Sequence, residues 1–187
     1  MKGFALLTTL VCASQVVHSY DYASRDYWDE DQPTNCKGRR QSPIAINSSD
    51  VQDLYFYNQL TLRNYDIKIP GKLKNNGHTL QFDPTQGPGT AGVTQPCLSC
   101  AVLQGEYEFL QYHFHWGATN DRGSEHTIDG IQFPMEMHMV HINKKYNGNA
   151  ANALAASDGL AVLGIMFQIS YQTSPALTVS LRSFDSL

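Results

Sequence analysis

The stretch that decides the fold is Tyr107-Glu-Phe-Leu-Gln-Tyr-His-Phe-His-Trp-Gly117, in which side chains alternate in character. Successive side chains of a β-strand point to opposite faces of its sheet, so this pattern predicts a strand. One face would carry Gln111, His113 and His115, while the opposite face, up to Trp116, would be a bulky apolar wall. The pattern therefore predicts a strand that presents two imidazoles on the same side.

A second alternating segment, residues 133–142, places Glu136 and His138 on one face. Three neutral imidazoles around a divalent ion leave a fourth tetrahedral position for solvent, as in catalytic zinc sites. A glutamate two residues before the third histidine is placed to accept a hydrogen bond from a ligand ring. We therefore expect a Zn²⁺ site made by His113, His115 and His138. The alternative is that these histidines are partly buried and satisfied by hydrogen bonds alone.

Five short motifs follow one another along the chain. They are Arg-Gln-Ser-Pro-Ile at 40–44, Asn-Asn-Gly-His at 75–78, Gln-Tyr-His-Phe-His-Trp-Gly at 111–117, Gly-Ser-Glu-His-Thr at 123–127 and Glu-Met-His-Met-Val-His at 136–141. In this order they closely resemble the motifs of the alpha class of carbonic anhydrases. The resemblance runs from about Tyr22 to about Gln168. It implies a mainly β (α+β) fold with a central twisted, mostly antiparallel sheet and short peripheral helices.

The resemblance also implies a reaction, the zinc-dependent reversible hydration of carbon dioxide to bicarbonate and a proton. His78 matches the histidine that relays protons to solvent, and Glu125 matches a glutamate that normally holds an active-site threonine. These two residues are the expected catalytic groups beside the metal ligands. His126 and His141 are interpreted as packed structural histidines.

Further residues match positions around the family's metal and substrate. Gln111 and Glu136 match the partners that stand behind two of the ligand histidines. The residues that match the substrate pocket are Val140, Val162 and Tyr22. The resemblance thus implies a small-molecule substrate, carbon dioxide or bicarbonate.

The end of the chain departs from the family pattern. Complete family domains are longer and carry a Thr-Thr-Pro-Pro segment, which does not occur after Ile169. We therefore expect residues 20–187 to form a single domain that is incomplete at its C-terminus and less active than a complete relative. The alternative function is a truncated, weakly active or inactive secreted zinc-binding protein of the same family.

The N-terminal residues 1–19 are typical of a signal peptide, with Lys2 before a short apolar run and small residues before Tyr20. This run is too short and too interrupted to cross a membrane, and no other stretch approaches the needed length. A buried N-terminal helix is the alternative. The pattern predicts a soluble, secreted protein, in which Asn47-Ser-Ser would be a candidate glycosylation site.

Cysteine usage and charge add two expectations. After loss of Cys12 with the leader, the spacing of Cys97 and Cys100 allows a disulfide across a tight loop, a redox pair or a metal pair. The resemblance implies that Cys36 pairs with a cysteine beyond the part of the family present here. The net charge of -4 provides no basic surface for nucleic acid, so no such partner is expected.

Local patterns predict the remaining elements. Short alternating runs at 60–63 and 67–69 indicate strands, and 83–100 is rich in Gly, Pro and Thr, as surface loops are. An alanine-rich stretch at 150–156 favours a short helix. The continuous apolar run at 160–167 predicts a central strand buried on both faces.

Overall fold

The computed structural model describes residues 10–11, 39–52 and 60–172. Strands dominate this part of the chain. Its helices are short: the 3-10 helices η2 (Ser48–Asp50) and η3 (Lys144–Tyr146), and the α-helix α3 (Ala150–Leu154). The predicted mainly β class is confirmed.

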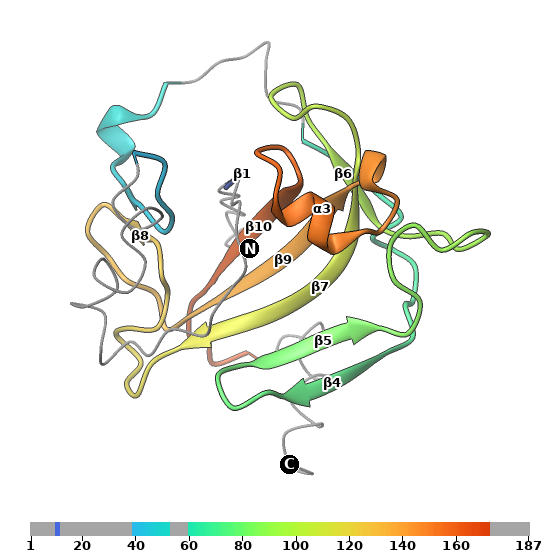
Figure 1. The fold of residues 1–187 in the computed structure, drawn as a ribbon. Helices are drawn as coiled ribbons and strands as arrows, with labels where there is room; N and C mark the ends of the chain where they lie inside the picture. Colours follow the sequence, from blue (N-terminus) through green and yellow to red (C-terminus); the bar gives the residue numbers. More distant parts are fainter. Residues whose placement is uncertain (1–9, 12–38, 53–59, 173–187) are drawn as a thin grey trace.

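A curled sheet organises the described residues, and Figure 1 shows its main strands side by side. Neighbouring strands along the main path are antiparallel. Their spatial order is β1 (Leu10–Val11), β10 (Leu160–Phe167), β9 (Met135–Asn143), β7 (Tyr107–Trp116), β5 (Leu80–Pro84) and β4 (Gly71–Asn75).

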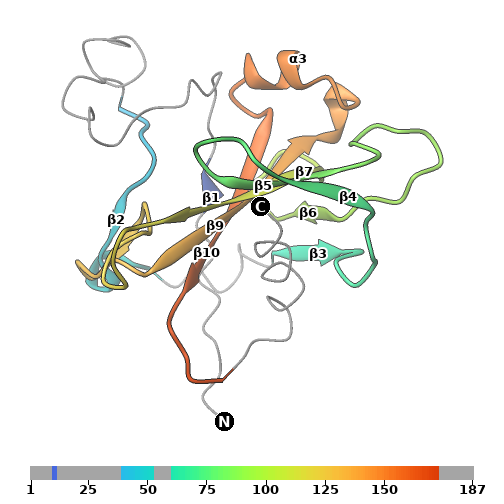
Figure 2. The same cartoon turned by 90° about the horizontal axis from the view of Figure 1, so that it is seen from below.

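Two shorter ladders complete the described strands. β6 (Cys97–Ser99) pairs with the beginning of β7 and with β3 (Thr61–Arg63), as Figure 2 shows from below. The parallel pair β2 (Ala45–Ile46) and β8 (Thr127–Ile128) lies apart from the main sheet. β7 therefore has β9 on one side and β5 and β6 on the other, which makes it an interior strand.

β10 is the predicted apolar strand over 160–167, and this prediction is confirmed. Alternate residues of β10 enter two buried clusters, so apolar groups cover both of its faces. One cluster consists of Leu98, Tyr107, Ala161 and Leu163; the other consists of Val140, Ile142, Ala153 and Leu160. The second cluster also holds α3 against the sheet, because Ala153 is its buried residue. The predicted short helix is thus confirmed.

Two local predictions are wrong. Residues 67–69 form no strand, since the chain has just turned at Asn64, whose φ is 61°, and runs on without ladder pairing. Within the predicted loop at 83–100, residues 97–99 form β6 because Leu98 is buried between β3 and β7, with 1% of its surface exposed. Alternation alone did not identify which run finds a partner strand.

The N-terminal residues are described only in β1, which falls within the predicted leader. Leu10 and Val11 pair with Leu163 and Val162 of β10. The rest of residues 1–19, including Cys12, lies outside the described residues, as do Tyr22 and Cys36. No helix in the described ranges is both long and apolar enough to traverse a bilayer.

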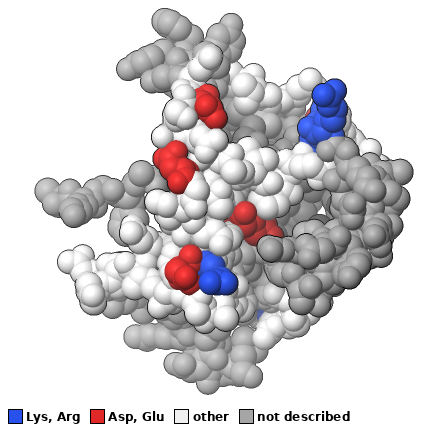
Figure 3. Space-filling model, turned by 90° about the vertical axis from the view of Figure 1, so that its left-hand side faces the viewer, with Lys and Arg blue, Asp and Glu red and all other residues white. Residues whose placement is uncertain are grey.

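Among the described residues, charged side chains are sparse on the face seen in Figure 3. The described acidic and basic groups there are scattered, and the basic ones do not merge into a continuous surface. The expectation that nucleic acid is not a partner stays a prediction.

Candidate metal centre

Strands β7 and β9 bring three histidines together. His113 and His115 lie on one face of β7, and the register of the two strands sets His113 directly opposite His138. One ring nitrogen from each histidine lies within 4.8 Å of the other two. The ring centroids are 5.0 Å apart for His113 and His115, 5.3 Å for His113 and His138, and 4.6 Å for His115 and His138. The three imidazoles carried by these two neighbouring strands thus lie around one common position.

Burial keeps the imidazoles of His113 and His115 uncharged near neutral pH. It lowers the pKa of His113 to about 4, with further lowering from the neighbouring rings of His115 and His138. Burial and the nearby His138 likewise lower the pKa of His115 to about 4. Metal ions bind neutral imidazole, so little proton release opposes binding. Three imidazole nitrogen donors fit the coordination that Zn²⁺ prefers.

Two of the three rings are oriented by an acceptor on their strand. The Oε1 atom of Gln111 lies 3.0 Å from Nδ1 of His113, and Oε1 of Glu136 lies 2.7 Å from Nε2 of His138. Because these oxygens accept, the contacted nitrogens carry the protons. The opposite nitrogens, Nε2 of His113 and Nδ1 of His138, keep their lone pairs for a metal.

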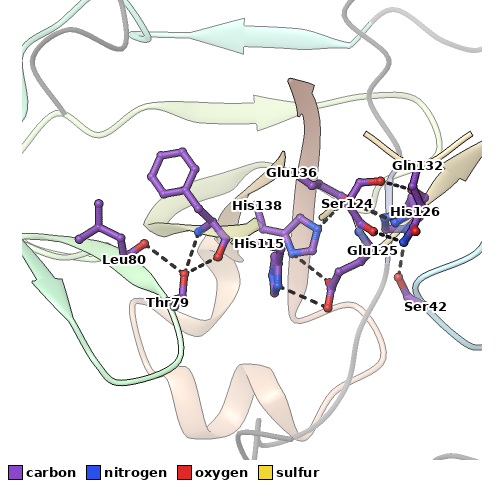
Figure 4. Close-up of polar contacts among 11 residues, drawn as sticks. Ser42, Thr79, Leu80, His115, Ser124, Glu125, His126, Gln132, Glu136 and His138 are labelled. Atoms are coloured by element: carbon purple, nitrogen blue, oxygen red, sulfur yellow. Dashed lines mark hydrogen bonds and ion pairs between the residues drawn. The ribbon is translucent and has the colours of Figure 1, made fainter. Parts of the chain in front are cut away.

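The Glu136 carboxylate is completely buried, yet four donors surround it (Figure 4). Oε1 accepts from Nδ1 of His126 and Nε2 of His138, both at 2.7 Å. Oε2 accepts from the backbone N–H groups of Glu125 and His126, both at 2.9 Å. Burial raises the pKa of Glu136, but these hydrogen bonds outweigh it, so the net pKa lies well below its usual range. The carboxylate is therefore ionised and firmly held.

His126 is a packed residue whose ring connects two motifs. Its Nδ1 bonds to Glu136, and its Nε2 lies 3.4 Å from the Ser42 hydroxyl of the 40–44 motif. One nitrogen or oxygen atom from each of His126, Glu136 and His138 also lies within 4.8 Å of the other two. Their short contacts are those of hydrogen bonds, with both rings donating to one carboxylate oxygen, so this group holds the ring of the candidate ligand His138 in place.

The Glu125 side chain lies close to two of the candidate ligand rings, those of His115 and His138. Its Oε1 lies 3.4 Å from Nδ1 of His115, and its Oε2 lies 3.8 Å from Nδ1 of His138. Figure 4 shows the carboxylate facing both rings. Glu125 is thus brought together with the expected metal ligands.

The comparisons with known proteins agree with this geometry. The model of the eukaryotic-type carbonic anhydrase family matches residues 23–187. The chain belongs to the carbonic anhydrase family. Because the match reaches the last residue, the expectation that resemblance stops near Gln168 is wrong.

Individual carbonic anhydrases share more than a third of their aligned residues with this chain. Human carbonic anhydrase 3 is 35% identical over 162 residues, which cover 82% of this chain and 57% of the relative. Human carbonic anhydrase 7 is 38% identical over 154 residues, covering 81% and 56%. Bovine carbonic anhydrase 3 is 38% identical over 151 residues, covering 80% and 54%. The chain spans about half the length of the curated relatives it matches.

These relatives contradict the predicted extracellular localisation. Carbonic anhydrases 3 and 7 are cytosolic forms, not secreted ones. A leader peptide, a glycan and disulfides likewise gain no support from them. Asn47 is the N-cap residue of η2, and its amide donates to Asp50 across an exposed turn, at 3.2 Å.

Of the options that the sequence left open for Cys97 and Cys100, a disulfide between them is not formed, as both thiols are free. Cys97 lies buried in β6, where its Sγ donates to the Gln95 carbonyl at 3.4 Å, whereas Cys100 lies beyond the end of the strand.

The apolar wall of β7 is also shorter than predicted. Tyr112 stacks on Phe82 with 5.0 Å between ring centroids, but Trp116 is 53% exposed.

His78, which the family resemblance led us to expect as a proton relay, lies on the exposed turn between β4 and β5. Asn76 Oδ1 accepts from the N–H groups of His78 at 3.0 Å and Thr79 at 2.9 Å. In the described part of the chain, His78 is not among the residues grouped at metal-binding distance. It is therefore separate from the ligand set.

A residue that sequence reasoning missed joins this turn to β7. The Thr79 hydroxyl accepts from the N–H of Phe114 at 3.0 Å and donates to the carbonyl of the same residue. Phe114 stands between the two histidines of β7, so Thr79 attaches the His78 turn beside the metal centre (Figure 4). The sequence signal that could have pointed to Thr79 is its position directly after His78.

The two valines of the expected substrate pocket are also adjacent. Val140 of β9 and Val162 of β10 are direct partners in the strand register. Val140 is buried, and Val162 packs against the cluster that contains it. Along β9, Val140 lies on the same face as His138, so the apolar pair begins next to the ligands. Tyr22, the remaining pocket candidate, lies outside the described residues.

Proposed function

We propose that the chain binds one zinc ion through His113, His115 and His138 and catalyses the reversible hydration of carbon dioxide. The observation that carries this proposal is the convergence of three imidazole nitrogens within 4.8 Å of one another. Family membership supports it, because carbonic anhydrases are zinc-dependent. Zinc held by three imidazoles, for which carbonic anhydrase is itself the reference example, lowers the pKa of a bound water to about 7 and supplies a nucleophile at neutral pH.

Acceptors behind the ligands keep the site ready for metal. Gln111 holds the Nδ1 proton of His113, and Glu136 holds the Nε2 proton of His138. Each contact selects the tautomer whose other nitrogen faces the centre. Rings held in this way lose little rotational freedom when a metal binds.

Two valines and one glutamate beside the ligands have separate roles in the proposed reaction. The paired side chains of Val140 and Val162 provide an apolar surface on which the small, uncharged substrate displaces water. Carbon dioxide is uncharged and makes no ion pair with the protein, so an apolar surface suits it. Glu125 faces the rings of His115 and His138 and provides the acidic group beside the site.

His78 is proposed to carry the proton that the reaction releases. It lies on an exposed turn that Thr79 attaches to β7, so it has access to solvent while remaining beside the ligand strand. An imidazole exchanges a proton readily near neutral pH.

Metal analysis of the full chain tests the first half of the proposal. Purified protein should hold one equivalent of zinc, and His115→Ala should lose most of it because one of three donors is gone. His78→Ala is the matched control, since it also removes a histidine but leaves the ligand set intact. Equal zinc content in both variants would contradict the assigned site.

Stopped-flow hydration of carbon dioxide tests the second half. The zinc-loaded chain should accelerate hydration above the buffer rate, and His115→Ala should remove the acceleration. One bound zinc with no acceleration would contradict the catalytic assignment and leave a zinc-binding member of the family.

A further inference from the structure

A glycine stands opposite the third histidine. Gly164 of β10 is the direct strand partner of His138 on β9. Directly opposed residues of an antiparallel pair project to the same face of the sheet. A side chain at 164 would therefore project toward the supporting residues of the metal site. Glycine weakens the interior of a strand and often marks a place where another group approaches closely.

The group that approaches is the Glu136 carboxylate. A Cβ atom added at Gly164 would lie 3.0 Å from Oε1 of Glu136 and 4.0 Å from its Cδ. The first distance is tighter than ordinary van der Waals contact, so the carboxylate would have to move by a few tenths of an ångström. Glu136 is completely buried, which leaves it no path toward solvent.

The carboxylate has little freedom to make that movement. Oε1, the atom that faces Gly164, bonds to the rings of His126 and His138 at 2.7 Å. Oε2 is fixed by two backbone N–H groups at 2.9 Å. Displacing the carboxylate would lengthen its hydrogen bond to the ring of His138 or turn that ring away from the metal position.

We propose that Gly164 is a positioning residue for the metal centre. Its missing side chain leaves the space in which Glu136 reaches and orients the ring of His138. The inference rests on the proposed function for its effect on zinc, although the geometric effect on Glu136 and His138 is independent of metal. A merely structural glycine would instead affect folding without affecting these two side chains.

Gly164→Ala in the full chain is the test, with two matched controls. Gly87→Ala adds the same methyl group where nothing lies within 4 Å. Leu163→Ala perturbs the same strand through a core residue that is 3% exposed, so it lowers stability beside the site without pushing on Glu136. Together they separate a general effect of alanine, or of a weaker β10, from a specific effect on the carboxylate.

The first measurement uses metal-free protein. Imidazole N–H protons that donate to a buried carboxylate give downfield proton NMR signals, and those of His126 and His138 should shift upfield in Gly164→Ala alone. The second is zinc affinity, measured by competition with a chelator at a temperature where every variant is folded. Changing groups that orient metal ligands typically weakens binding by about 10–100-fold, and we expect about tenfold for Gly164→Ala.

The outcomes distinguish this inference from the proposed function. Shifted imidazole signals in Gly164→Ala support the positioning role even if the wild-type chain binds no zinc, a result that would overturn the proposed function alone. Unchanged imidazole signals in folded Gly164→Ala would overturn the inference whatever the zinc result. An equal loss of zinc affinity in Leu163→Ala would also overturn it, because strand stability would then explain the effect.

Discussion

The Glu125 carboxylate lies against the ring of His115, with 3.4 Å between its Oε1 atom and Nδ1 of the imidazole. The other two candidate ligands have acceptors of their own, Gln111 for His113 and Glu136 for His138. The backbone N–H of Glu125 also donates to Glu136 at 2.9 Å, which holds this part of the chain in place. Each imidazole of the proposed zinc site thus has an oxygen acceptor nearby.

Replacing Glu125 tests whether this contact matters for metal binding. Glu125→Ala should weaken zinc affinity about tenfold, because the Nδ1 proton of His115 loses its acceptor. Glu125→Gln keeps a carbonyl oxygen at the same position and should retain most of the affinity. Chelator competition at neutral pH measures both. An alanine variant that binds zinc as tightly as the wild type would show that the contact has no role in binding.

Thr79 should stabilise the fold through Phe114. Thr79→Val keeps the shape of the side chain but leaves two backbone groups of a residue that is 5% exposed without their partner. Leaving buried polar groups unsatisfied costs about 1–3 kcal/mol. Urea unfolding should show a loss of that size. The control is Thr90→Val, because that hydroxyl bonds to the Gly87 carbonyl in an exposed turn. Equal losses in the two variants would argue against the assignment.

His141 should make the free energy of unfolding depend on pH. It is fully buried beside Tyr65 and Phe109, and burial lowers its pKa from 6.5 to about 4. Between these values the unfolded chain binds more protons than the folded chain. The contribution of the neutral His141 side chain to the free energy of unfolding is therefore fully present above pH 6.5 and is lost as the pH falls toward 4. One such group adds a slope of up to about 1.4 kcal/mol per pH unit.

The His141→Gln variant isolates this effect. Urea unfolding of zinc-loaded protein at several pH values from 7 to 4.5 should give a shallower slope for the variant than for the wild type. The comparison uses slopes, since the substitution also changes packing and so the stability at every pH. Identical slopes would mean that the pKa of His141 is the same in the folded and unfolded protein, which would contradict the prediction.

His78 should affect turnover without affecting metal. His78→Ala should slow hydration by on the order of 10²-fold in weakly buffered solution, in the range typical of acid–base groups. Added imidazole should restore much of the rate, because a free base can replace an exposed relay. Zinc content should stay at the wild-type value. A slow variant that imidazole does not rescue would indicate a structural role for this turn.

Some of this architecture follows from local patterns. The eight apolar residues at 160–167 predicted β10 with its observed bounds, Leu160–Phe167, because a strand buried on both faces needs only a continuous apolar run. The short alternating run at 67–69, Ile-Lys-Ile, was also predicted to be a strand but forms none. Whether a run is paired depends on a neighbouring strand, which can come from a distant part of the chain. Residues 67–69 follow a turn that leaves them without a ladder.

The amino-acid sequence by itself determined that His113 and His115 share a face, because side chains alternate with a period of two along any strand. It also set Glu136 and His138 on one face of β9 for the same reason. Only the tertiary structure decided that His138 stands opposite His113, that His126 joins Glu136 from a loop, and that Gly164 lies against the Glu136 carboxylate. These relations depend on the register between strands, which is set by packing of the whole sheet and by the irregularity between Phe109 and Gln111. A one-residue shift of β9 in that register would move Glu136 and His138 to the opposite face of the sheet.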